Sequence, residues 1–203
     1  MASLALGQEL VYQQLLKPPA VRDGVSFAGS VTADLAAGEI FVTDVRNNRI
    51  LIFDAEGRFR FQINGGDVFS APLEVAVDPQ GFLLVIATYE LQRSLIELDF
   101  DGLFLRAIEF KNIPEDAPQP KIDSVALSPS GETIYVLDRR NLLLWITDRT
   151  GDIQVVTDLA VELSEEERLG FLLRHVDAYA DTVLIPFPRT GQIGLFDPDG
   201  KAR

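Results

Sequence analysis

Residues 38–57 read Gly38-Glu-Ile-Phe-Val-Thr-Asp44-Val-Arg-Asn-Asn-Arg49-Ile-Leu-Ile-Phe-Asp54-Ala-Glu-Gly57. Two apolar, β-branched runs, 40–43 and 50–53, flank a short polar turn, which predicts an antiparallel pair of strands. Neither run alternates cleanly between apolar and polar residues, so both strands are expected to be buried on both faces. The stretch closes on Asp54-Ala-Glu-Gly57, where glycine supplies the positive φ that a tight hairpin turn requires.

The closing turn of this stretch recurs along the chain. Its four copies begin with Asp and end with Gly, at 54–57, 99–102, 148–151 and 197–200, and their glycines are 45 to 49 residues apart. A second set of markers, Gly38, Gly81, Gly131 and Asp181, precedes the apolar runs 39–43, 82–87, 133–137 and 182–186 at steps of 43 to 50 residues. Two markers that share one period indicate a repeated structural unit.

Each unit is interpreted as four strands. In the second unit we expect strands at 73–77, 82–88, 94–98 and 103–108, in the third at 124–127, 134–137, 142–146 and 153–156, and in the first at 30–33, 40–43, 49–53 and 59–63. Four-stranded sheets that repeat every 40 to 50 residues are typical of propeller blades. The prediction is an all-β fold, a β-propeller of four-stranded antiparallel blades at about 25–64, 72–110, 121–158 and 174–203.

Residues 38–57 resemble an NHL repeat, with its strand, Asp, Asn-x-Arg-Ile turn, second strand and Gly. The third unit keeps Asp138 and Asn141, with Leu142 in place of the arginine, and the second and fourth units match weakly. The resemblance implies a propeller that is usually six-bladed and most often serves as an interaction platform. Neighbouring six-bladed families include lactonases and lyases.

The two ends of the chain leave the number of blades open. The fourth unit reaches Lys201-Ala-Arg203 where its last strand is expected to begin, and the N-terminal segment 1–24 contains one extra strand candidate at 9–16. That strand can complete the fourth sheet and close a ring of four blades, or the units can belong to a six-bladed ring. Residues 1–7 are interpreted as a frayed terminus or the remnant of a signal peptide, so the compartment is left open.

Composition excludes several classes of function. The net charge of −13 disfavours nucleic acid and anionic lipid as partners, and no run approaches the ~20 apolar residues of a membrane-spanning helix. The absence of cysteine excludes disulfides, thiolate nucleophiles and cysteine metal sites. We expect a soluble, acidic repeat protein.

The two faces of the expected propeller differ in charge. One face has the Asp-rich closing turns, while the opposite face has the long connections 65–72, 111–121 and 159–174, the last with a helix start predicted at Ser164. This long-loop face also has the arginines Arg46, Arg49, Arg93, Arg139, Arg140 and Arg189. Long loops on a rigid scaffold often bind partners, so we predict that a protein or peptide binds there. The alternative is that the arginines pair with nearby carboxylates and only stabilise the turns.

The sequence contains no convincing catalytic constellation and implies no cofactor. Four polar residues fall at or near the innermost strands of their units, namely Glu74, Asp123, His175 and Asp177. They suggest an alternative function as a metal-assisted hydrolase or lactonase with a divalent cation such as Ca²⁺ in the central channel. The simpler interpretation is that they are solvated or turn-capping groups.

Overall fold

The computed structural model describes residues 16, 24–161, 173–188 and 191–203, which form fifteen strands and no helix. The first sheet contains β1 (Ala28–Asp34), β2 (Glu39–Asp44), β3 (Arg49–Asp54) and β4 (Phe59–Asn64). The second contains β5 (Ser70–Val77), β6 (Leu83–Tyr89), β7 (Gln92–Leu98) and β8 (Phe104–Ala107). The third contains β9 (Ser124–Leu127), β10 (Thr133–Asp138), β11 (Leu143–Asp148) and β12 (Ile153–Asp158), and the fourth β13 (Asp177–Tyr179), β14 (Thr182–Phe187) and β15 (Gln192–Phe196).

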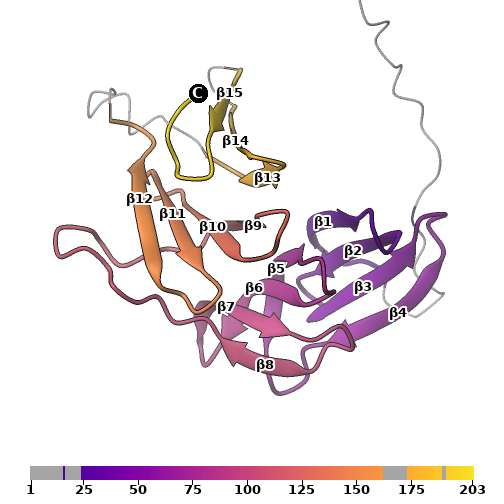
Figure 1. Cartoon of the computed structure of the whole chain (residues 1–203). Helices are drawn as coiled ribbons and strands as arrows, with labels where there is room; N and C mark the ends of the chain where they lie inside the picture. Colours follow the sequence, from indigo (N-terminus) through magenta and orange to yellow (C-terminus); the bar gives the residue numbers. More distant parts are fainter. Residues whose placement is uncertain (1–15, 17–23, 162–172, 189–190) are drawn as a thin grey trace, which may run out of the picture.

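The four sheets are the blades of a β-propeller, which confirms the predicted fold class. Each sheet is an antiparallel meander in chain order, and the sheets follow one another around a common centre with β1, β5, β9 and β13 innermost (Figure 1). The fourth sheet has three strands, and after β15 the chain turns back so that Ala202 pairs with Phe196. The pairing places Ala202 where the fourth strand of the other blades begins.

The hydrophobic core lies between successive blades. In the first blade Ile50 and Ile52 pack against the second blade, whereas Leu51 and Phe53 face the other way. All four of these side chains are at most 1% exposed, and full burial of such a side chain contributes roughly 1.5–3 kcal/mol. Strands apolar on both faces are therefore what a stack of blades requires, as the sequence indicated.

The closing turns form as predicted and also join the blades. In each turn the Asp Oδ1 accepts two backbone N–H groups, as Asp148 does from Thr150 at 2.8 Å and from Asp152 at 3.1 Å. Gly151 has a φ of 85°, and a Cβ there would lie 2.1 Å from the carbonyl oxygen of Glu109 in the preceding blade. Glycine is thus required by both the turn and the close approach of two backbones.

Two sequence expectations need correction. The connection expected at 65–72 is shorter, because β5 already begins at Ser70, which pairs with Thr88 ahead of a bulge. The arginine position of the repeat falls on Leu143, not Leu142, because Asp44 pairs with Arg49 and Asp138 pairs with Leu143.

The ends of the arc are only partly described. Leu16 packs against Val42, Leu51 and Phe53 of the first blade. The rest of the candidate strand 9–16, like the helix predicted from Ser164, lies outside the described residues, so its place in the fourth sheet stays a prediction. On the outer face of the fourth blade, Ile193 and Leu195 are exposed. Within the described residues, no helix has the length and hydropathy of a membrane span.

Candidate functional site

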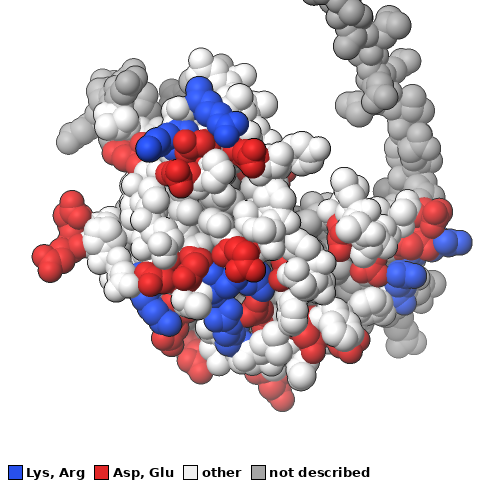
Figure 2. Space-filling model, in the orientation of Figure 1, with Lys and Arg blue, Asp and Glu red and all other residues white. Residues whose placement is uncertain are grey.

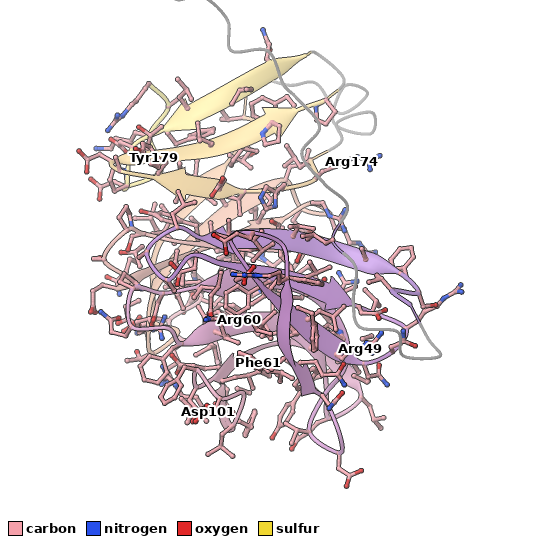
Figure 3. All side chains as sticks on the ribbon, turned by 90° about the vertical axis from the view of Figure 1, so that its right-hand side faces the viewer. Arg49, Arg60, Phe61, Asp101, Arg174 and Tyr179 are labelled. Atoms are coloured by element: carbon pink, nitrogen blue, oxygen red, sulfur yellow. The ribbon has the colours of Figure 1, made fainter. Side chains whose placement is uncertain are left out.

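The long-loop face and the face with the Asp-rich closing turns, here called the short-turn face, lie on opposite sides of the propeller. Figure 3 shows Arg49 and Arg174 toward one side and Asp101 and Tyr179 toward the other. Figure 2 shows the short-turn face, where carboxylates and basic side chains lie in neighbouring clusters. One such cluster joins the second and third blades, because Arg149 pairs with both Asp78 and Glu97, and Arg106 also binds Glu97.

Arg49, one of the predicted binding residues, belongs to the interior of the first blade. Its Nε donates to the buried Asp44 carboxylate at 3.0 Å, and its Nη1 donates to Gln62 at 3.2 Å. Asp44 also accepts from Asn47 Nδ2 and from the backbone of Ser26, so the pair joins the turn to the preceding loop. Burial by itself raises the pKa of Asp44, but these donors outweigh it and hold the pKa below its ordinary value.

Arg93 and Arg139 are placed differently, on the surface of the long-loop face. From the second and the third blade they converge on Asp123 Oδ1, at 2.8 Å and 3.0 Å. Asp123 also accepts the backbone N–H of Arg139 at 3.0 Å. The arginine side chains remain 46% and 42% exposed, and two guanidinium groups outnumber the single carboxylate between them.

The other predicted arginines are peripheral to this pair. Arg46 and Arg140 are exposed, and their side chains make no ion pair within the described part of the chain. Arg189 lies outside the described residues. The structure therefore brings together Arg93 and Arg139 and buries Arg49 apart from them.

Leu91 is a feature of the same face that the sequence analysis missed. It is 99% exposed at the tip of the turn between β6 and β7, with a φ of 66°, next to Glu90 with a φ of 46°. Pairing of Tyr89 with Gln92 makes this a two-residue hairpin turn. The sequence contained one indication of this feature, because a leucine occupies a hairpin-turn position where Asn or Gly is favoured.

A cavity of about 800 Å³ lies at the centre of the propeller. The innermost strands of all four blades line it, with small and apolar side chains such as Val31, Ala76, Val125 and Ala178. The ionisable lining residues are Asp34, Glu74, Asp78, Asp177, His175 and Tyr179, and no lysine or arginine is among the described lining residues. His175 thus borders the central channel, as predicted.

Glu74, Ser124 and His175 meet at one end of this cavity, from three different blades. Ser124 Oγ donates to Glu74 Oε1 at 2.7 Å and lies 3.1 Å from His175 Nδ1. Glu74 Oε1 also accepts the backbone N–H of Val125 at 3.1 Å and lies 3.3 Å from His175 Nδ1. The hydrogen bond to Glu74 raises the pKa of His175 against the opposing effect of burial.

The four candidate metal ligands are not gathered in one place. Glu74 and His175 are in contact, but Asp123 binds the two arginines and Asp177 is exposed at the start of β13. Among the described residues, no group of three or more His, Asp or Glu side chains has the arrangement of a metal site.

Comparison with known proteins supports the fold. No family model matches the chain, and no curated protein matches it. Among solved structures, the chain is similar to Kuenenia stuttgartiensis hydrazine synthase (TM-score 0.57, 16% identity, 86% of this chain and 47% of that chain). It is also similar to a chain of the nidogen/laminin complex (TM-score 0.61, 16% identity, 86% and 61%).

A third similar structure is the Myceliophteria thermophila Cps50 (Swd1) β-propeller domain, with a TM-score of 0.54, 15% identity and coverage of 84% and 53%. At such identities the likeness shows the propeller fold alone. The chain spans about half to three fifths of the length of these structures. Membership of the NHL family stays a prediction.

Proposed function

We propose that the protein is a non-catalytic propeller scaffold that binds a protein or peptide partner through its long-loop face. The supporting observation is the pair Arg93 and Arg139, which share Asp123 and keep nearly half of each side chain in solvent. Arginine at a surface combines charge, a planar hydrogen-bonding fork and an apolar stem, and it is enriched in interfaces. An acidic peptide segment fits this site by charge.

Leu91 adds an apolar contact to the same proposal. A fully exposed leucine in the left-handed region costs conformational energy and buries nothing in this chain. Seated against a partner's apolar side chain, Leu91 would lose that exposed surface, which contributes roughly 25 cal/mol per Å². The partner segment then combines acidic residues with at least one apolar residue.

The experiment measures binding of a fluorescent peptide of alternating Glu and Leu by anisotropy. We expect Arg93→Glu with Arg139→Glu to abolish binding and Leu91→Ser to weaken it. The matched control is Arg58→Glu, since Arg58 is an exposed, ion-paired arginine in a closing turn on the opposite face. Equal binding by the wild type and the Arg93/Arg139 variant would overturn the proposal.

A metal-assisted hydrolase remains the second candidate, supported by the contact between Glu74 and His175. Only these two of the four candidate ligands are in contact. Calorimetric titration with Ca²⁺, Mg²⁺ and Zn²⁺ tests it, and the absence of a binding isotherm with all three ions would eliminate it.

A further inference from the structure

The hydrogen bonds of Ser124 at the central cavity determine which ring nitrogen of His175 donates and which has no partner among the described residues. Ser124 Oγ gives its proton to Glu74 Oε1 and accepts the backbone N–H of Val176 at 3.1 Å. Its remaining lone pair faces His175 Nδ1, so Nδ1 must hold a proton and donate. The Nε2 atom is then the one that gains or loses a proton.

Two polar atoms at this site have no partner within the described part of the chain. Glu74 is only 9% exposed, and all of its hydrogen bonds reach Oε1, so no described residue donates to Oε2. His175 Nε2 likewise has no partner among the described residues, although Nδ1 has two. Both residues line the cavity, and solvent reaches them there, since the side chains of His175 and Glu74 are 53% and 11% exposed. The two atoms are therefore accessible to a ligand that enters the cavity.

The rest of the cavity determines what kind of group suits these atoms. Asp177, two residues after His175 and the first residue of β13, adds negative charge, and Asp34 lines the cavity from the first blade. Of the lining carboxylates, Asp78 has a described cationic partner outside the cavity, Arg149 at 3.0 Å. Between the polar positions the walls are mostly valine and alanine side chains, with some leucine and proline.

We propose that the central cavity binds an alkylammonium ligand, a primary amine on an apolar chain, whose –NH₃⁺ group donates to Glu74 Oε2 and to neutral His175 Nε2. The apolar chain lies along the valine and alanine walls. Tyr179, the last residue of β13, is exposed toward the same side as Asp101 (Figure 3) and lines the same cavity. This site is separate from the arginine pair of the long-loop face and does not depend on the proposed peptide binding.

The single histidine of the chain makes the proposal measurable. The probe is n-hexylammonium chloride, and the readout is the NMR titration of the His175 ring protons. A bound ammonium ion disfavours the imidazolium, so the ligand is expected to lower the pKa of His175. By the same linkage, hexylammonium binds more tightly at about pH 9 than at about pH 6.

Two variants separate the site from a general effect of charge. Glu74→Gln keeps an acceptor for Ser124 and Val125 but removes the charge, and we expect about ten-fold weaker hexylammonium binding. Asp101→Asn, in an exposed closing turn, removes one carboxylate outside the cavity and should leave binding unchanged. Circular dichroism of each variant confirms that it is folded.

Three results would overturn the proposal: hexanol or hexanoate binding as tightly as hexylammonium, no change in the His175 titration, or equal losses in Glu74→Gln and Asp101→Asn. Displacement of the amine by Ca²⁺ at equal concentration would instead assign the cavity to a metal ion. Peptide binding by the wild type is measured separately, so failure of one proposal leaves the other decided on its own data.

Discussion

Two arginine–carboxylate sites on the long-loop side of the propeller differ in what the arginine does. In the first blade, Arg49 and Asp44 are both buried, and the carboxylate is surrounded by donors from the turn and from the loop before β1. Between the second and third blades, Arg93 and Arg139 share Asp123 at the surface. The distances are similar, 3.0 Å against 2.8 Å and 3.0 Å, so exposure rather than geometry distinguishes them.

The difference shows how the same residue types divide between folding and binding. A buried arginine has lost its hydration and must keep its carboxylate, so Arg49 is committed to the fold. An exposed arginine retains its hydration and exchanges partners at little cost, so Arg93 and Arg139 remain available to a ligand. Substitutions in the Asp44–Arg49 pair should therefore mainly lower stability, and substitutions at Arg93, Arg139 and Asp123 should mainly change ligand binding.

The largest expected effect is that of Asp44→Ala. It leaves the Arg49 guanidinium buried without its carboxylate, along with the side-chain amide of Asn47 and the N–H of Ser26. We expect a loss of about 3–5 kcal/mol in the free energy of unfolding, measured by urea denaturation. A loss below about 1 kcal/mol would place this pair in the same class as the surface site.

Acid should also weaken the buried Asp44–Arg49 pair, with a smaller loss of stability than Asp44→Ala. The pKa of Asp44 is lowered in the folded protein, so its contribution to stability is complete above its unfolded pKa of about 3.8 and disappears as pH falls through the folded value. The stability difference between the wild type and Asp44→Asn should therefore shrink between about pH 5 and about pH 2. Thermal denaturation across this range measures it, and a constant difference would contradict the stated cause.

Asp123→Asn should cost less than about 1 kcal/mol in the free energy of unfolding, because the arginines that lose their partner are 46% and 42% exposed and stay hydrated, although Asp123 itself is only 11% exposed. The same change removes the carboxylate shared by Arg93 and Arg139, so it should strengthen binding of the acidic peptide. Asparagine keeps an acceptor for the backbone of Arg139. Weaker peptide binding by this variant would argue against an acidic partner.

The smallest effect is expected for Arg46→Ala. Arg46 is exposed and makes no ion pair within the described residues, so the change in the free energy of unfolding should stay within about 0.5 kcal/mol. Any loss of peptide binding in this variant would extend the binding surface toward the first blade. A large loss of stability would show that exposure does not distinguish the two kinds of arginine.

Local patterns predicted the repeat well because each turn is built from its own residues. Asp99 Oδ1 accepts from the N–H groups of Asp101 and Leu103, so a four-residue motif suffices to identify the turn. The predicted faces also follow, since strand order determines on which side each turn lies. The boundaries of β5 were less predictable, because Ser70 pairs beyond a bulge that has no local signature.

The candidate site was predicted only in part. The sequence placed Glu74 and His175 at the central channel, but it could not show that Ser124 joins them, since the three residues are 50 and 51 positions apart. It grouped Asp123 with them, whereas the structure directs that carboxylate to two arginines. Leu91 went unnoticed because its exposure depends on the surface around the turn.

By itself, the sequence determined that this chain is a repeat of short antiparallel sheets, each with an Asp-Gly turn on the same face. It did not separate the charges by face, since Arg58 and Arg149 lie in or beside those turns and pair with carboxylates there. Period, turn chemistry and apolar runs are local properties, and hydrogen bonds within a few residues are enough to enforce them. Only the tertiary structure decided which arginine is buried, which carboxylate it meets, and which side chains enter the central cavity. Those outcomes depend on contacts between blades, where burial sets the cost of leaving a charge unpaired.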